Sequence, residues 1–249
     1  MLSEGKVLNK LEEKKRLREL PELERPRTVR LKFRKVGSLQ YISHLDLQRT
    51  FMRILVRACI PTWYTKGFNP HAKLVFSTPL SVGAQSEYEF LDVRIDRDMP
   101  CEEIMERMNR EMTEELCITK AYIPTHDFSE IAWASYEIKI ATKGADGELA
   151  HRMETLLRTS PVHLVKKTKA GEKEIDIVPM IRLFNAEYCE DGTVEIRTVL
   201  KASSTEFLNP EMLITAMKRE LGILSGDPTE EWYTILRTSV MDAEMNLFR

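Results

Sequence analysis

The stretch Thr28-Val-Arg-Leu-Lys-Phe-Arg-Lys-Val36 alternates apolar and basic residues. Strict alternation of this kind is typical of a β-strand that is buried on one face only. The predicted buried face consists of Val29, Leu31 and Phe33. The predicted outward face carries the cations Arg30, Lys32 and Arg34. The stretch therefore predicts a sheet with one apolar face and one basic face.

A helix is predicted directly after this strand. Ser43 precedes apolar residues at helical spacing, and Asp46 follows three residues later, as in a capping box with Asp in place of Glu. Arg49, Arg53 and Arg57 recur every four residues on the side opposite the apolar face. Ser43 and Asp46 thus have a structural interpretation as helix caps, which competes with any role in a site.

The same reasoning extends along the rest of the chain. In the first half it predicts strands over 72–78, 87–95 and 117–123, and a helix over 100–112. In the second half it predicts strands over 132–142 and 232–241, hairpins over 162–178 and 182–202, and helices over 147–158 and from Asn209 to Gly222.

The order β-α-β-β-α-β is the ferredoxin-like plan. We therefore predict an α+β protein of two tandem ferredoxin-like halves with antiparallel sheets and extra strands in the second half. The predicted parts are a charged N-terminal extension or linker (1–26), a first half with a basic patch (27–127) and a second half (128–249).

The charge of the chain is segregated. The whole chain has a formal net charge of −2, from 37 Lys or Arg and 39 Asp or Glu residues. The segment from Arg27 to Leu80 holds ten of the basic residues and a single acidic one, Asp46, so the remaining residues carry 27 − 38 = −11. A basic segment that also contains His, Asn and Tyr favours an anionic partner, with nucleic acid as the first candidate.

Composition places the chain among globular proteins, with 43% hydrophobic and 31% charged residues. No apolar run approaches the roughly 18 to 20 residues of a membrane span, and the charged start lacks a signal peptide's apolar core. Cys59, Cys101, Cys117 and Cys189 are scattered without a paired spacing, which disfavours a zinc or iron–sulfur site. We expect a cytoplasmic protein with reduced thiols and no membrane partner.

Four motifs carry a resemblance to a known family: Phe33-Arg-Lys-Val-Gly37, Tyr41-Ile-Ser-His-Leu-Asp46, Gly67-Phe-Asn-Pro-His71 and Pro79-Leu-Ser-Val-Gly83. From about Arg27 onward the chain resembles the radical SAM-linked protein family, a bacterial domain of unknown function. The resemblance implies a radical SAM protein as partner and a context of ribosomes and RNA processing. The chain has no C-x-x-x-C-x-x-C run, so we expect the radical chemistry to belong to another polypeptide.

The candidate binding residues fall into two sets. The first is the outward strand face of Arg30, Lys32 and Arg34, where phosphates could be neutralised. A solvated or covered face is the alternative, and no exposed aromatic residue alternates with these cations. The second set would form a cationic pocket if the helix start and the Gly67–His71 turn converge: Tyr41, His44, Lys66, Asn69, His71 and Lys73. A metal site from His44, Asp46 and His71 is disfavoured, because residues i and i+2 of a helix point apart.

We expect an accessory binding module that presents an anionic substrate, RNA in the first place, to a radical SAM partner, and we expect it to need no cofactor or metal. Two alternatives stay open. One is a metal-independent RNA-processing enzyme that uses His44 or His71 with Lys66. The other is a structural subunit whose basic face docks on an acidic partner. Whether the chain has a catalytic activity of its own is left open, with binding alone favoured.

Overall fold

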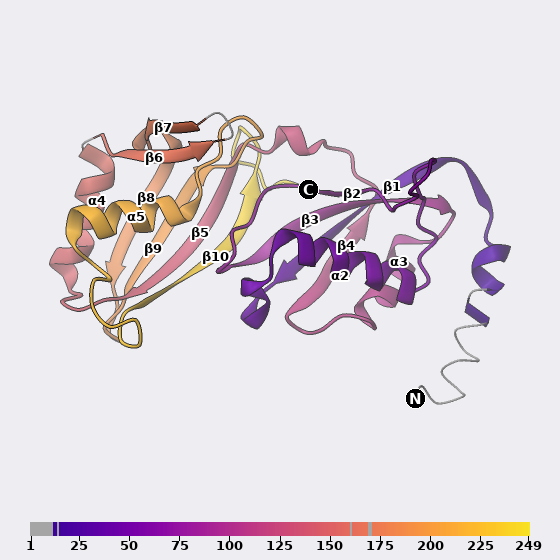
Figure 1. Ribbon diagram of the computed structural model, residues 1–249, viewed down its shortest axis with the longest axis horizontal. Coiled ribbons are helices and arrows are strands. Elements are labelled where there is room, and N and C mark those ends of the chain that lie inside the picture. The colour runs from indigo at the N-terminus through magenta and orange to yellow at the C-terminus, as the bar shows by residue number, and fades with distance from the viewer. Residues whose placement is uncertain (1–11, 14, 160, 169–170) are drawn as a thin grey trace. The chain divides into compact units, whose positions relative to one another are not determined.

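A computed structural model describes residues 12–13, 15–159, 161–168 and 171–249 of the chain (Figure 1). Its strands are mostly antiparallel and are combined with a few helices, which confirms the predicted α+β class. The chain divides into two compact units. Unit 1 contains residues 1–82, 88–126 and 249, and unit 2 contains residues 83–87 and 127–248. Residues 1–11 and 14 of the predicted extension lie outside the described residues.

Unit 1 follows the predicted element order. Its elements are β1 (Glu22–Lys35), η1 (Gly37–Tyr41), α2 (His44–Arg57), β2 (Leu74–Phe76), β3 (Ala84–Arg97), α3 (Cys101–Asn109) and β4 (Leu116–Tyr122). Strand β1 lies between β4 and β3, and β2 pairs with the other side of β3. Antiparallel pairing joins β1 to β4 and β2 to β3. Strand β3 begins in unit 2 and continues into unit 1.

The alternation in β1 has the predicted consequence. Val29, Leu31 and Phe33 are fully buried in one cluster with residues of both α2 and α3. The strand nevertheless starts at Glu22, six residues earlier than predicted, and includes Pro26. A proline is tolerated there because the pairing of β1 with β4 starts only at Arg30, so the ladder on that side needs no donor from Pro26.

The caps of α2 agree with the sequence. Ser43 is the N-cap, and its Oγ accepts a hydrogen bond from the Asp46 amide. The reciprocal contact differs from a capping box, because the Ser43 hydroxyl donates to the Asp46 carboxylate, 2.7 Å away. The hydrogen bond from this hydroxyl is the main reason that the pKa of Asp46 lies below its ordinary value, and the nearby Arg49 lowers the pKa further. The structural interpretation of Ser43 and Asp46 is confirmed.

Unit 2 contains the second set of predicted elements with boundaries that shift by one or two residues. They are β5 (Trp133–Ala141), α4 (Gly147–Thr159), β6 (His163–Thr168), β7 (Gly171–Asp176), β8 (Ile181–Tyr188), β9 (Val194–Lys201), α5 (Pro210–Leu221) and β10 (Trp232–Met241). Two short 3-10 helices, η2 (Phe128–Glu130) and η3 (Val178–Met180), were not predicted. The strand order is β10-β5-β9-β8, and β6 and β7 form a separate two-stranded sheet. Helix α5 begins after the Asn209 cap and ends at Gly222, whose φ of 69° suits glycine.

Candidate functional site

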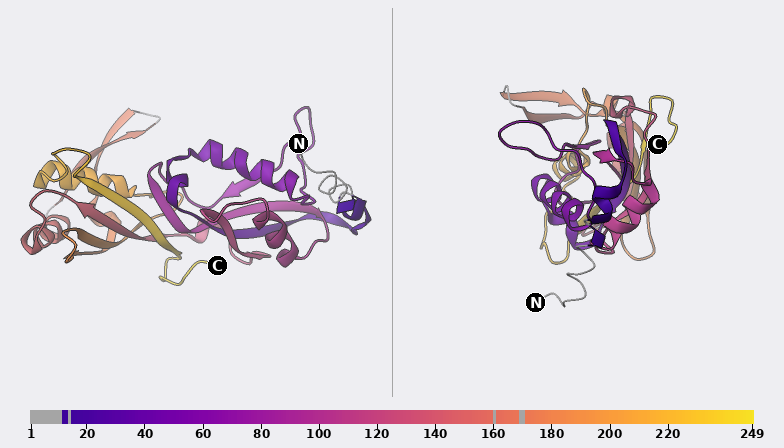
Figure 2. Two further views of the ribbon diagram at one scale, coloured as in Figure 1. Left: turned by 90° about the horizontal axis from the view of Figure 1, so that it is seen from below. Right: turned by 90° about the vertical axis from the view of Figure 1, so that its right-hand side faces the viewer.

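Hydrogen bonds between Thr65 and His71 close the loop that lies between α2 and β2. The Thr65 amide donates to the His71 carbonyl at 3.0 Å, and the His71 amide donates to Thr65 Oγ1 at 3.2 Å. Tyr64 and Ala72 form a bridge immediately outside this pair. Gly67 has a φ of 139°, which a side chain would strain. The closure leaves residues 66–70 as an exposed tip, and the segment projects from unit 1 (Figure 2).

His71 has a structural role in this closure that the sequence did not reveal. Its Nδ1 lies 3.0 Å from the Asn69 carbonyl oxygen and 3.2 Å from Thr65 Oγ1. A carbonyl oxygen only accepts, so Nδ1 donates the hydrogen bond to Asn69 in this arrangement. His71 therefore holds the two limbs of the loop together while its ring stays exposed.

Phe68 stands at the tip of the loop with its side chain completely exposed. Lys66 and Asn69 are exposed beside it, and Lys73 is exposed where the chain enters β2. Among the contacts described, neither Lys66 nor Lys73 has an ion-pair partner. An aromatic ring with two available cations matches what a nucleic acid strand needs, a surface for base stacking and charges for phosphates. We call residues 64–73 the aromatic loop.

Sequence reasoning missed Phe68, although it lies within a motif quoted above. The signal was available. A phenylalanine between Gly67 and Asn69-Pro70 sits in a turn, where no periodic apolar face can bury it.

His44 and Tyr41 lie apart from the aromatic loop. His44 is the first residue of α2, and its ring packs edge-on against Phe76 with 4.8 Å between ring centroids. Tyr41 is exposed at the end of η1. The aromatic loop instead follows the C-terminal end of α2, a helix of 14 residues that is about 20 Å long. The groove that His44 lines does not include His71, so the convergence on which the cationic pocket depended is not observed.

Arg30 is a second correction. The prediction places it on an open strand face, but only 2% of the residue is exposed. Its guanidinium donates two hydrogen bonds to the Asp92 carboxylate on β3, at 2.7 and 2.8 Å, and one to the His126 carbonyl at 2.9 Å. Arg30 is thus a buried structural cation and is not available to a phosphate.

The neighbouring cations of β1 are half-buried and also have partners. Lys32 Nζ lies 3.3 Å from the centre of the Tyr88 ring, a cation–π contact. Arg34 donates twice to the Glu114 carbonyl. Tyr122 on β4 stands opposite Arg30, and burial raises the pKa of its phenol to about 12. Aromatic residues do accompany this face, but they come from β3 and β4, so alternation within β1 could not reveal them.

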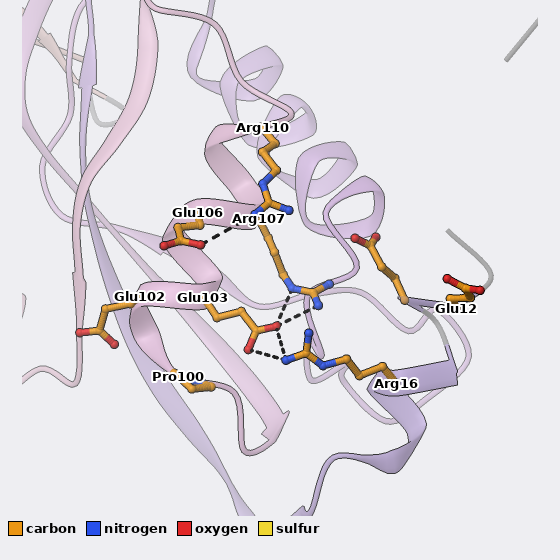
Figure 3. A pocket seen from close by; sticks show the side chains of 9 residues that line it. Glu12, Arg16, Pro100, Glu102, Glu103, Glu106, Arg107 and Arg110 are labelled. Carbon is orange, nitrogen blue, oxygen red and sulfur yellow. Dashed lines mark hydrogen bonds and ion pairs between the residues drawn. The ribbon is translucent and has the colours of Figure 1, made fainter. Parts of the chain in front are cut away.

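A cavity of 640 Å³ lies beside α3 and is dominated by charges of both signs (Figure 3). Glu103 lies between two arginines: it accepts from Arg16 at 3.3 Å and from Arg107 Nε at 2.9 Å. Arg107 is 7% exposed, and its Nη1 has no hydrogen-bond partner within the described part of the chain. Most of the charged side chains on its walls form ion pairs with one another. We therefore interpret the cavity as part of a structural contact between α3 and the N-terminal residues 12–13 and 15–20.

This contact leads to a prediction about stability. Replacing Glu103 by Gln removes the charged acceptor of the buried Arg107 guanidinium, so we expect a loss of about 1–3 kcal/mol in the free energy of unfolding. The side chain of Glu102, the adjacent residue of α3, forms no hydrogen bond or ion pair with the described residues, so Glu102→Gln is the matched control and should cost less than about 0.5 kcal/mol. Urea denaturation measures both. Equal effects of the two variants would contradict this interpretation of the cavity.

Two features are absent from the residues that the structure describes. No group of three or more His, Cys, Asp or Glu side chains in this part of the chain is arranged to hold a metal ion. Among the same residues, no helix combines the length and the apolar character that a membrane span requires.

Residues 28–210 match the family model described as "uncharacterized protein conserved in bacteria" (DUF2344). The match covers more than half of the chain. The chain belongs to this family. Membership of DUF2344 confirms the bacterial family of unknown function in the resemblance stated above, while the link to a radical SAM protein stays a prediction. The matched residues include the whole aromatic loop. No curated protein matches the chain.

Proposed function

We propose that this protein is an RNA-binding module that holds single-stranded or looped RNA through its aromatic loop and works with a radical SAM partner. The observation that carries the proposal is the completely exposed ring of Phe68 between Lys66 and Lys73. Sequence-tolerant binding of single strands combines stacking of bases on aromatic rings with cations along the backbone. The loop is closed by hydrogen bonds between Thr65 and His71, so the Phe68 ring is already exposed without a ligand and is available for stacking.

The contacts of the two histidines support binding without chemistry. An acid–base ribonuclease needs its base and its cation at one phosphate. His44 packs on Phe76, whereas His71 closes the loop through Nδ1. This arrangement favours binding without catalysis, with the chemistry supplied by the radical SAM protein that the resemblance implies.

We also infer that the protein is built from two ferredoxin-like halves. In unit 1 the four strands follow the order β4-β1-β3-β2, which is fourth-first-third-second in chain order. In unit 2, the strands β5, β8, β9 and β10 follow the same order, with β6 and β7 as an inserted hairpin. Shared element order and shared strand order support a common plan.

The test is a filter-binding titration of the full chain with total cellular RNA at two salt concentrations. We expect saturable binding that weakens with salt, because neutralised phosphates release counterions. The slope of log affinity against log salt is negative, and the double variant Lys66→Ala/Lys73→Ala should make it less steep by about 1.4, which is about 0.7 per lost contact on a single strand. Absence of saturable binding at low salt would overturn the proposal.

The matched control is Lys143→Ala/Lys173→Ala, which removes two exposed lysines of unit 2. We expect the control to retain the wild-type slope. A control that loses as much as the loop variant would show that the binding is a general charge effect, and this too would contradict a role for the aromatic loop.

A further inference from the structure

Strand β2 has an open edge. Of the described strands only β3 pairs with β2, in the register Leu74–Val93, Val75–Asp92 and Phe76–Leu91. The Ser77 amide donates to the Phe90 carbonyl, which shows which residues of this segment direct their backbone groups toward β3. In an antiparallel pair, alternate residues turn their N–H and C=O groups toward the partner strand. Val75 therefore faces β3 with Ser77, and the backbone groups of Leu74 and Phe76 point away from the sheet.

A groove of 480 Å³ runs along this open edge. One wall is the start of α2, with His44 and Gln48, and the other consists of residues 74–80. The Phe76 ring lies against His44 and is packed on Phe33 and Phe51, so the groove has a firm aromatic floor. The side chain of Val75 is 40% exposed on the outer side of the strand.

The chemistry of the edge matches an extended polypeptide. Two outward N–H groups and two outward C=O groups, spaced by two residues, are the pattern that an added β-strand satisfies. Alternate side chains of such a strand would enter the groove against Phe76 and Leu80, so they should be apolar. The groove is lined by no Asp or Glu, and the exposed Lys73 immediately precedes Leu74. The single positive charge of Lys73, with no acidic side chain on the groove walls, favours a carboxylate on the incoming segment.

We propose that β2 binds an extended, acid-containing segment of a partner protein as an additional strand, with its apolar side chains in the groove beside α2. The segment is short, because the Tyr64–Ala72 bridge closes the edge at one end and Pro79 follows at the other. Lys73 is common to this site and to the aromatic loop, but the backbone edge of β2 and the groove take no part in the proposed RNA binding, so the two proposals can be tested separately.

The probe is a random 12-residue peptide library displayed on phage and selected against the full chain. The decisive pair of variants is Leu74→Pro and Leu74→Ala. Both lose the leucine side chain, but only proline also loses the outward N–H. For selected peptides we expect Leu74→Pro to weaken binding about five- to tenfold relative to Leu74→Ala, the effect of a lost backbone hydrogen bond. The RNA affinity of Leu74→Pro should equal that of Leu74→Ala. This result would separate peptide binding at β2 from RNA binding at the aromatic loop.

A second measurement uses the wild-type chain and does not depend on the folding of a variant. Amide hydrogen exchange at Leu74 and Phe76 should slow when a selected peptide is bound. Equal binding by the two Leu74 variants, unchanged exchange at these amides, or a library without binders would each overturn the proposal. A concentration-dependent dimer of the wild-type chain that Leu74→Pro abolishes would also overturn it, because the occupant would then be a second copy of this chain.

Discussion

Asp92→Ala is expected to lower the free energy of unfolding by about 3–5 kcal/mol, because it leaves the buried Arg30 guanidinium without its carboxylate. Arg30 is 2% exposed and donates two hydrogen bonds to the Asp92 carboxylate. Arg30 Nη1 donates to the carbonyl of His126, an acceptor that carries no charge. Removing one partner of a buried ion pair costs more than the pair itself contributes, since the other charge stays in a poorly solvated place. Equilibrium denaturation with urea measures the loss.

Asp98→Ala is the matched control for this experiment. Asp98 pairs with Arg27 at a position where 55% of its side chain is exposed, so its loss should cost less than about 1 kcal/mol. The double variant Arg30→Met/Asp92→Leu should recover most of the stability that Asp92→Ala loses. If Asp92→Ala and Asp98→Ala were equally stable, the assignment of Arg30 as a buried structural cation would be contradicted.

Phe68→Ala is expected to weaken RNA binding about 5- to 150-fold, the equivalent of about 1–3 kcal/mol for one stacked base. The side chain is completely exposed, so the free energy of unfolding should change by less than about 0.5 kcal/mol. The combination of an intact fold and lost affinity distinguishes a contact residue from a core residue. Phe68→Trp should preserve the affinity, because a larger ring also stacks.

Tyr188→Ala provides a control with another exposed aromatic residue, on β8 of unit 2. Its RNA affinity should equal that of the wild-type chain. Unchanged affinity in Phe68→Ala, measured in the same titration, would rule out stacking on the aromatic loop even if the RNA binding itself were salt-dependent.

Much of the fold could be predicted because local patterns determine it. Alternation identified the buried face of β1, Ser43 and Asn209 marked the starts of α2 and α5, and Trp232 to Met241 is β10 as predicted. The errors arose where pairing between strands, and not the local sequence, sets the ends of an element. The predicted extension ended at residue 26, but β1 already begins at Glu22 and includes Pro26, because its pairing with β4 starts only at Arg30.

The candidate site was harder to predict because it depends on contacts between distant residues. Periodicity placed Arg30 on the outward face correctly, yet it could not show that β3 sets Asp92 beside it. The meeting of His44 and His71 was likewise a question of distance in space, and the intervening helix separates them. Phe68 is the opposite case, since its turn context already argued against burial.

The central claim is that RNA contacts the aromatic loop, and photo-crosslinking tests it most directly. The full chain, irradiated in complex with cellular RNA and digested with protease, would be analysed by mass spectrometry for peptides that carry a nucleotide. We predict that the nucleotide is attached within residues 64–73, at or next to Phe68, and that crosslinking falls in Phe68→Ala. Crosslinks confined to unit 2, or none above the level of an RNA-free control, would contradict the account.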